Sequence, residues 1–519
     1  MCSQRICSPS TDLQEVASRL NMVSGLDQMK FSSDYLCSVM GHWPDLAKLV
    51  QRLTTKTTNQ STANDLLALK HLLVQVIQAK ELIDYDLEQV DSLDIQRDFA
   101  TLLNQISIPT ELVDAIEVAI DEEALTAFQI EQEKKQQLVS ELGQTAVDKV
   151  SSSQADNQWG TNLNPIIRKS FNPALEQAHD HLASLRIEAS NLQTELGNGF
   201  NSPNLSLRDV IKYGPVIHVL KKEGTAKLDT NSRFIQVTTK INSASTRMYF
   251  YPAWTELHHS IESAMVAIRN LERDSIGSLV DEVRAKYDDL QRTADGLAQL
   301  DLTNSLAVLA KELNLVRPVV NDSQSLSIQD GRHLAVERAL TSSGRQFTTN
   351  SLVMDHPNSF VHCLTGPNMA GKSTFLRQSA IIVILAQAGS FVPAKSCEIG
   401  IVDRVFSRVG ARDELDRNKS SFMVEAEEAA CILNESTSRS LVLLDELGRG
   451  TSPIDGISIA YATLEHIVAV NKARTLFATH FHRLGHLIPH GDYAGKDEWH
   501  GLEFWCTDVR EEKVNKSRQ

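Results

Sequence analysis

A glycine-rich turn between a strand-like run and a helix-like run constrains this 519-residue chain more than any other feature. Residues 360–365 are mostly apolar, and residues 374–385 carry apolar side chains at helical spacing. A turn of this kind surrounds a phosphate with backbone N–H groups at the positive end of a helix dipole. The predicted phosphate-binding residues are Gly366, Pro367, Asn368, Met369, Ala370, Gly371, Lys372, Ser373 and Thr374.

A second apolar run, residues 441–444, ends in the two acids Asp445 and Glu446. A buried parallel strand that delivers carboxylates to its C-terminal edge has this pattern. We expect Asp445 and the Ser373 hydroxyl to hold Mg²⁺, and Lys372 to place a positive charge on the phosphates. Glu446 is positioned to orient or deprotonate the water that attacks a γ-phosphate. Taken alone, two acids at the end of a strand would more often be solvated residues without a catalytic role. The phosphate loop in the same domain favours the catalytic interpretation.

Five stretches together make the chain resemble the MutS family of DNA mismatch-repair ATPases. They read TGPNMAGKSTFLRQ, FSRVGARDEL, SSFMVE, LVLLDELGRGTSPIDG and LFATH. The resemblance implies an ABC-type ATPase fold that works as a dimer, uses ATP and Mg²⁺, and hydrolyses ATP in a DNA-dependent manner. The family more often has glycine where Ala370 stands, a change between small residues that should keep the loop.

The resemblance also assigns roles to four residues outside the phosphate loop. It implies that Ser420 reaches the γ-phosphate held by the other subunit, that Ser452 lies in the loop after the acidic strand, that His480 senses the γ-phosphate, and that Phe347 stacks on adenine. Taken alone, Ser420 would more often cap a helix, His480 would lie at the surface and Phe347 would belong to a core. These four roles therefore depend on the family likeness.

Helical patterns and one basic stretch precede the phosphate loop. Apolar residues recur at helical spacing over residues 12–99, 110–146 and 254–300, with a possible break at Gly277, and a further helix is predicted from Ala174 to about Leu196. Residues 205–240 contain β-rich pieces that predict short antiparallel strands. The same stretch has seven basic and three acidic residues, a local charge of +4 in a chain of net charge −15.

The basic stretch has two interpretations. Binding to a DNA backbone depends on local charge, because the Debye length is about 8 Å at physiological salt. Charge alone supports equally well the alternative that these residues form a solvent-exposed face of a small sheet with no role in DNA binding. The stretch falls where the resembled family carries its DNA clamp, which implies contacts with DNA from Lys221, Lys222, Lys227 and Arg233.

These observations predict a multidomain α and α/β protein. A helical lever would receive a small β-containing clamp as an insertion, and an ABC-type P-loop NTPase domain would follow. The predicted segments are residues 1–165 (first part of the lever), 166–250 (clamp), 251–320 (second part of the lever) and 321–519 (ATPase domain, incomplete at its C-terminus).

The leading functional hypothesis is ATP-dependent mismatch binding and repair. The implied partners are mismatched double-stranded DNA, a MutS-type subunit in a homo- or heterodimer, and a MutL-type downstream protein. The resemblance begins inside the family's helical core and ends before its helix-turn-helix, so we expect either a fragment or a branch without a mismatch reader. Two alternatives stay open: a reader-less branch acting on recombination intermediates, and a DNA- or partner-binding fragment without turnover.

The cysteine content and the absence of long apolar runs indicate the cellular compartment. The seven cysteines are scattered without the spacing of zinc sites, which favours a reducing compartment. We expect no membrane span, because no run of 18 apolar residues occurs, and no secretory signal is legible at the start. This predicts an intracellular protein. Residues 375–394, FLRQSAIIVILAQAGSFVPA, resemble the fungal mitochondrial branch of the family, which implies a mitochondrial or nuclear location if the protein is eukaryotic. A transporter ATPase is disfavoured, because no membrane partner segment is legible and the long helical lever would be unexplained.

Overall fold

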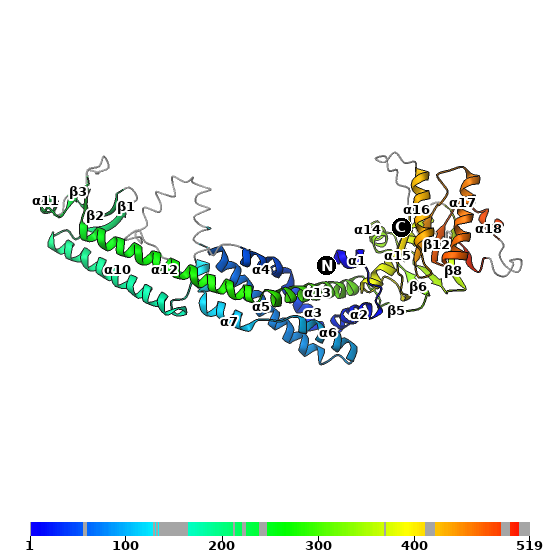
Figure 1. Ribbon diagram of the computed structural model, residues 1–519, viewed down its shortest axis with the longest axis horizontal. Helices are drawn as coiled ribbons and strands as arrows, with labels where there is room; N and C mark the ends of the chain where they lie inside the picture. Colours follow the sequence, from blue (N-terminus) through cyan, green and yellow to red (C-terminus); the bar gives the residue numbers. More distant parts are fainter. Residues whose placement is uncertain are drawn as a thin grey trace, which may run out of the picture. The chain divides into compact units, whose positions relative to one another are not determined.

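The chain divides into two compact units, and Figure 1 labels their helices and strands. The computed structural model describes residues 2–55, 60–127, 130, 133, 165–210, 213–220, 225–237, 246–367, 370–409, 421–488 and 499–507. The first unit contains Met1–Gly41, Ala79–Gln105 and Asp295–Gln519, and the second contains His42–Gln78 and Ile106–Ala294. The segment boundaries expected at residues 165, 250 and 320 stay predictions.

Long helices make up most of the second unit. Among the described residues its helices are α4 (Leu46–Thr55), the first part of α5 (Gln60–Leu87), α7 (Thr110–Ala119), η2 (Lys169–Phe171), α10 (Pro173–Gly199), α11 (Thr225–Asp229) and α12 (Pro252–Ala285). Helix α10 begins after Asn172, whose side chain accepts a hydrogen bond from the backbone N–H of Ala174 at 2.9 Å. It corresponds to the helix predicted from Ala174 to about Leu196.

One small antiparallel sheet completes the second unit. Its strands lie in the order β1 (Ser206–Val210), β2 (Gly214–Leu220), β4 (Thr246–Phe250) and β3 (Ile235–Gln236). Val216 and Tyr249 are fully buried, and the ring of Phe234 stacks on that of Tyr251 with centroids 4.8 Å apart. The short antiparallel strands predicted in this part of the sequence are present.

The helix break expected at Gly277 is wrong. Helix α12 runs through Gly277 to Ala285, and α13 (Tyr287–Glu312) begins after Lys286. A glycine inside a helix costs only about 1 kcal/mol relative to alanine. The neighbouring side chains Ile276 and Leu279 are buried, so their packing offsets that cost.

The first unit begins with helices that pack closely. They are α1 (Cys2–Cys7), α2 (Leu13–Gln28), α3 (Lys30–Val39), most of η1 (Met40–His42), the last part of α5, α6 (Leu93–Gln105) and the greater part of α13. Asp12 caps α2 by accepting a hydrogen bond from the backbone of Gln14 at 2.8 Å. None of the helices in the described part of the chain is long and apolar enough to cross a membrane.

Two sheets follow in the first unit. The parallel sheet has the order β10 (Val405–Arg408), β11 (Leu441–Asp445), β12 (Arg474–Ala478), β8 (Ser359–Thr365) and β13 (Gly501–Cys506). The second sheet has the order β5 (Val319–Asn321), β9 (Ser396–Gly400), β6 (Leu326–Gly331) and β7 (Asn350–Met354). The helices are α14 (Leu334–Ser342), α15 (Lys372–Ala388), α16 (Ser421–Glu435), α17 (Pro453–His466), the π-helical η4 (Ile467–Asn471) and α18 (Leu484–Leu487).

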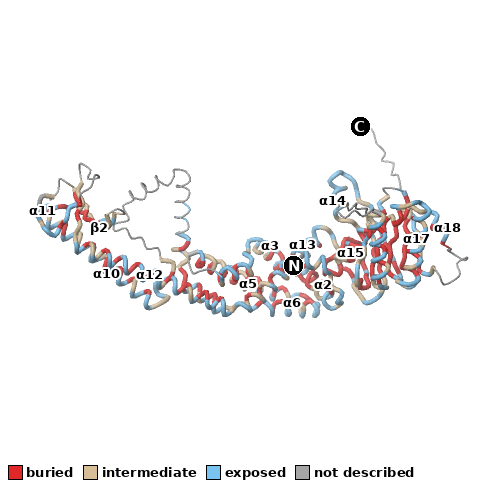
Figure 2. The backbone as a smooth tube through the Cα atoms, turned by 45° about the horizontal axis from the view of Figure 1, so that its top comes forward, coloured by how far each residue is buried: buried red, intermediate tan, exposed pale blue. Residues whose placement is uncertain are grey.

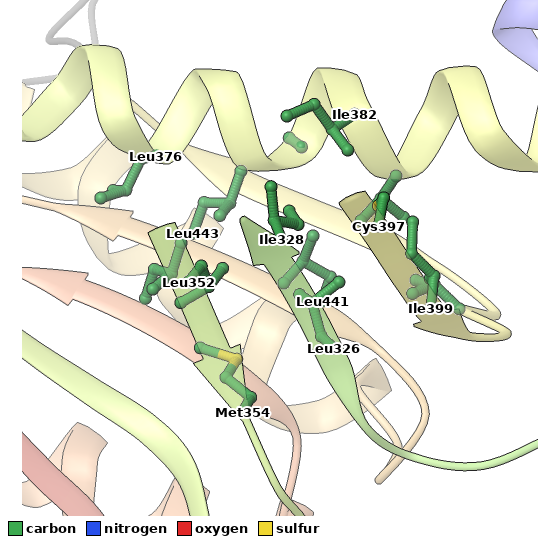
Figure 3. Close-up of a cluster of buried hydrophobic side chains, with 14 of the residues drawn as sticks. Leu326, Ile328, Leu352, Met354, Leu376, Ile382, Cys397, Ile399, Leu441 and Leu443 are labelled. Atoms are coloured by element: carbon green, nitrogen blue, oxygen red, sulfur yellow. The ribbon is translucent and has the colours of Figure 1, made fainter. Parts of the chain in front are cut away.

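Strand β11 lies at the centre of the apolar core. Leu441 and Leu443 belong to the cluster that includes Ile382 of α15 (Figure 3). Val442 and Leu444 point to the other face and join the cluster formed with α16 and α17. Successive strand residues face opposite sides of a sheet, so an apolar run of this kind requires both faces to be covered. All five residues of β11 are buried, and buried backbone (red) is concentrated near α15 and α17 in Figure 2.

Arg474, at the start of β12, links the two sheets. Its guanidinium is fully buried and donates to the backbone carbonyls of Gly400 at 2.7 Å and Ile401 at 2.9 Å. Gly400 ends β9 of the second sheet. Burial lowers the pKa of Arg474 to about 10, so the side chain stays charged at neutral pH.

Candidate functional site

The glycine-rich turn lies between β8 and α15. Strand β8 ends at Thr365, and α15 begins at Lys372 directly after Gly371, which has a left-handed backbone with φ of 86°. The strand–loop–helix order expected from the sequence is therefore present. Ala370, Ser373 and Thr374 are half-buried and Pro367 is exposed, whereas Asn368 and Met369 lie outside the described residues.

The first glycine of the turn is required by a close approach. Gly366 has φ of 146°, and a Cβ atom at this position would overlap the Thr507 side chain. Thr507 follows β13 and donates its backbone N–H to the Thr365 carbonyl at 2.9 Å. Thr507 thus packs directly against the start of the turn, and only glycine fits at position 366.

Lys372 is held inside the turn. Its side chain is 6% exposed, and Nζ donates to the carbonyl oxygens of Gly366 at 2.8 Å and Pro367 at 3.0 Å. A buried ammonium needs acceptors of this kind. The turn therefore keeps a positive charge at the N-terminus of α15, where the helix dipole also favours an anion.

Asp445 lies at the same edge of the sheet. In register, Asp445 is opposite Ala478 of β12, and Ala478 is opposite Leu364 of β8. Neighbouring strands are about 4.8 Å apart, so the ends of β11 and β8 are separated by about 10 Å across β12. The Asp445 side chain is 6% exposed, and Oδ1 has no hydrogen-bond partner among the described residues.

A buried carboxylate oxygen without a donor is costly unless something else binds it. A divalent cation fits this oxygen, because Mg²⁺ is bound in proteins through one or two carboxylates, with substrate phosphates and water. Ser373 is the second residue of α15 and could offer its hydroxyl from the turn. Asp445 and Ser373 therefore fit the Mg²⁺ site expected from the sequence, although the contact between them stays a prediction.

Glu446 is fixed by its backbone and by two side chains. Its φ of 55° is left-handed, and its N–H donates to the Ala478 carbonyl at 2.9 Å. Oε1 lies 2.6 Å from Nε2 of His480, and Oε2 accepts a hydrogen bond from Arg449. Burial acts to raise the pKa of Glu446, but the hydrogen bonds from Arg449 and His480 outweigh it and hold the pKa below its ordinary value. Glu446 is therefore a carboxylate at neutral pH.

A cavity of about 330 Å³ opens beside this pair. Its lining residues are Glu446, Gly448, Arg449, Thr451, Pro453, Thr479, His480 and Phe481. The cavity gives water and small molecules access to the Glu446 carboxylate. Lys372 and Asp445 are not among the lining residues, so the cavity covers the Glu446 side of the sheet edge.

Glu425 is a site residue that the sequence analysis did not single out. It lies in α16, is 4% exposed, accepts a hydrogen bond from the backbone N–H of Gly448, and lies 3.7 Å from the guanidinium of Arg408. The loop after β11 is thereby tied to α16. The signal in the sequence was an acid on an apolar helical stripe, since Glu425 falls between Phe422 and Ala429 at spacings of three and four.

The other predicted site residues lie in several places. Ser452 caps α17 by accepting a hydrogen bond from the Asp455 backbone at 3.3 Å, and its hydroxyl donates to the Asp455 carboxylate at 2.6 Å. Phe347 is half-buried in the loop between α14 and β7. Ser420 lies outside the described residues, so its predicted role stays a prediction.

Arg233 is the one predicted DNA-binding residue whose side chain falls within the described part of the chain, and it is exposed just before β3. Lys221 and Lys222 lie outside the described residues, as does the side chain of Lys227 in α11. The predicted contacts with DNA stay predictions.

Comparison with known protein families decides the relationship. The model of MutS domain III matches residues 1–307, which is more than half of the chain, and the model of MutS domain V matches residues 362–494. The chain belongs to the MutS family. The resemblance inferred from the five motifs is thus confirmed, and the mixed helical and α/β architecture agrees with these two MutS domains.

Curated relatives extend the MutS match over nearly the whole chain. The DNA mismatch repair protein MutS of Rhodopseudomonas palustris (strain BisB18) is 33% identical over 518 residues, covering 98% of this chain and 53% of the relative. The protein of the same name from Roseobacter denitrificans is 34% identical over 529 residues, covering 98% and 54%. That from Bradyrhizobium sp. (strain ORS 278) is 40% identical over 325 residues, covering 62% and 35%. The chain spans about half the length of the curated relatives that it matches.

Proposed function

We propose that this MutS-family chain binds ATP with Mg²⁺, hydrolyses it, and uses the cycle to switch a DNA clamp in mismatch binding and repair. One observation supports the proposal most. The unpartnered buried oxygen of Asp445 and the carboxylate of Glu446, held by two side chains, lie at the sheet edge that also carries the Lys372 turn. Phosphoryl transfer needs this combination of fixed charges, because positioning and charge neutralisation supply most of its catalysis.

Lys372 would bind the β- and γ-phosphates. Its Nζ donates to two backbone carbonyls of the turn, and phosphate oxygens are stronger acceptors that would take their place. Asp445 and Ser373 would hold Mg²⁺, which neutralises phosphate charge when bound. Turn N–H groups and the α15 N-terminus would complete the phosphate site.

Glu446 would act on the attacking water. Its lowered pKa keeps it ionised, and its contacts with His480 and Arg449 fix the direction of the carboxylate. A fixed carboxylate can accept a proton from water in the adjoining cavity. We propose in addition that Phe347 stacks on adenine, that Ser452 belongs to the loop beside the phosphates, and that Ser420 completes the site of a partner subunit.

The DNA part of the proposal depends on local charge. The basic residues of the stretch 205–240 would contact the phosphate backbone of mismatched duplex DNA, with Lys221, Lys222, Lys227 and Arg233 as the main candidates. The curated relatives are named as DNA mismatch repair proteins, which supports this substrate class. A MutS-type subunit and a MutL-type downstream protein are the proposed partners.

A pair of variants tests the nucleotide site. Lys372→Ala should lose ATP binding, measured with a fluorescent ATP analogue. Glu446→Ala should bind ATP normally and lose turnover by roughly 10²-fold or more. Glu465→Gln, an exposed change on α17, is the matched control and should leave both unchanged. Robust hydrolysis by either of the first two variants would refute the assignment.

The DNA substrate is tested separately. ATP turnover and binding are compared with a mispaired duplex, a perfect duplex and a four-way junction. A preference for the mispair supports mismatch repair, whereas a preference for the junction supports a reader-less branch that acts on recombination intermediates. DNA binding by a wild-type chain that does not hydrolyse ATP would instead indicate a binding module without turnover.

A further inference from the structure

Three side chains with metal-ligand chemistry meet in the second unit, at the junction of its small sheet and α12. Asp209 comes from β1, and His258 and Glu262 come from α12. One nitrogen of His258 and one carboxylate oxygen from each acid lie within 4.8 Å of one another. Within the described ranges this is the one group of three such residues that converges in this way.

The convergence is not a product of sequence proximity. His258 and Glu262 are four residues apart, which places them on one face of the helix. Asp209 is far away in sequence and reaches the same point from the strand. A shared ion would therefore connect two elements that come together only through folding.

The His258 ring is held in place by its surroundings. Its side chain is 2% exposed, and it packs edge-on against the fully buried Trp254 at a centroid distance of 5.3 Å. The two acids are more open, with side chains 30% exposed for Asp209 and 51% for Glu262. The group thus has a rigid nitrogen ligand at its base and two carboxylates that can adjust from the solvent side.

The two acids approach different nitrogens of the His258 ring. Oδ2 of Asp209 lies 3.9 Å from Nε2 of His258, and Oε2 of Glu262 lies 3.8 Å from Nδ1. Both separations are too long for a hydrogen bond. An ion binds only one ring nitrogen, so the carboxylate beside the other nitrogen would have to turn towards the ion. Ligand atoms around a tetrahedral ion with bonds of about 2.0–2.1 Å are about 3.3 Å apart, and the three ligand atoms here lie within 4.8 Å of one another.

We propose that Asp209, His258 and Glu262 bind a divalent transition-metal ion of the zinc type, which fastens β1 to α12. One imidazole and two carboxylates are ligands that Zn²⁺ accepts, and three protein ligands leave a fourth position for water. The imidazole disfavours Ca²⁺ and Mg²⁺, which prefer oxygen. The charge of the ion offsets that of the two acids. The proposal is independent of the nucleotide site.

The test uses the full chain, stripped of metal with a chelator and kept in excess Mg²⁺ so that all-oxygen sites are filled. Zn²⁺ affinity is measured by competition with a chromophoric chelator, and Co²⁺ serves as the spectroscopic probe. We expect one tight Zn²⁺ per chain and a Co²⁺ spectrum without sulfur-to-metal bands. Those bands would mean that cysteines bind the ion, and they would overturn the proposal.

Matched variants locate the site. Asp209→Asn and Glu262→Gln keep the side-chain shapes, and each should weaken Zn²⁺ binding by at least tenfold, the double variant by more. Glu256→Gln and Glu282→Gln change exposed residues of the same helix and should bind Zn²⁺ like wild type. Zn²⁺ should raise the Tm of the wild type and both controls but not of the double variant. Unchanged affinity in the double variant would overturn the proposal.

Discussion

Nε2 of His480 lies 2.6 Å from Oε1 of Glu446, although the two residues are 34 positions apart in sequence. Glu446 directly follows β11, and His480 lies two residues after the end of β12. These two strands are neighbours in the parallel sheet. The C-terminal ends of parallel strands meet at one edge of a sheet, which is where α/β proteins place their ligands. Strand pairing therefore brings the histidine to the carboxylate.

Removing Arg449 should shift the pH dependence of turnover. Arg449 and His480 hold the pKa of Glu446 below its ordinary value, so Glu446 stays ionised to lower pH than an ordinary glutamate does. In Arg449→Met that pKa should rise, and the acidic limb of the profile of kcat/KM against pH should move to higher pH. Arg404→Met, which removes an exposed partner of Glu435, should leave the limb in place. A limb unmoved in Arg449→Met would contradict the role of Glu446.

The contact between Arg449 and Glu446 should also make the stability of the folded protein depend on pH. Because the folded pKa of Glu446 is lowered, its contribution to stability is present above the ordinary glutamate pKa. It is lost as pH falls through the folded value. Thermal unfolding between pH 7 and pH 3 should therefore show a smaller loss in Arg449→Met than in wild type.

Two glutamates of α16 should respond differently to the same substitution. Glu425→Gln weakens the hydrogen bond from Gly448 and leaves the buried Arg408 guanidinium with less compensation, at a cost of about 3 kcal/mol. Glu435→Gln removes an exposed pair with Arg404 and should cost less than about 1 kcal/mol. Urea unfolding measures both free energies, and equal values would contradict the buried contact.

Two glycines with similar backbones offer a second matched comparison. Gly448 and Gly344 both have positive φ, 88° and 73°, so alanine at either position costs about 1 kcal/mol in backbone strain. A Cβ at Gly448 would lie 2.6 Å from the Gly456 carbonyl oxygen, whereas one at Gly344 meets nothing within 4 Å. Gly448→Ala should therefore lower the Tm more than Gly344→Ala, and should also reduce ATP turnover because it displaces the loop after Glu446.

Shortening the Arg474 side chain should weaken the link between the sheets. Arg474→Lys keeps the charge, but one ammonium cannot replace the planar fork that bonds Gly400 and Ile401. We expect a loss of about 1–3 kcal/mol for each buried carbonyl left without a donor. Arg404→Lys, at an exposed position, should change the free energy of unfolding by less than about 0.5 kcal/mol. Chemical unfolding followed by circular dichroism gives both values.

Local patterns predicted the elements of the candidate nucleotide site well. The apolar run that became β11 and the turn before α15 have short-range signals, because a short continuous apolar run is typical of a buried strand and glycine spacing is typical of a turn. The long-range contacts had weaker signals or none. Nothing near Arg474 in sequence shows that it is buried, since its partners Gly400 and Ile401 come from the other sheet.

In the helical region, the sequence suggested a break that the structure does not have. Gly277 is the usual helix-breaking signal, yet burial of its neighbours keeps α12 continuous to Ala285. Propensity contributes about 1 kcal/mol at one position, and a single buried Leu or Ile side chain outweighs that. The position of a helix end therefore depends on packing that the sequence does not display.

Strand β12 fixes the spacing between the phosphate turn and the two acids. Thr479 donates to the Leu364 carbonyl, and Glu446 donates to the Ala478 carbonyl, each at 2.9 Å. Deleting one residue within β12 would exchange the faces of Leu476 and Phe477 and would carry His480 away from Glu446. The number of residues in β12 therefore determines where His480 lies relative to Glu446. Insertions and deletions that the protein tolerates should fall in the connections that flank β12 and not in the strand.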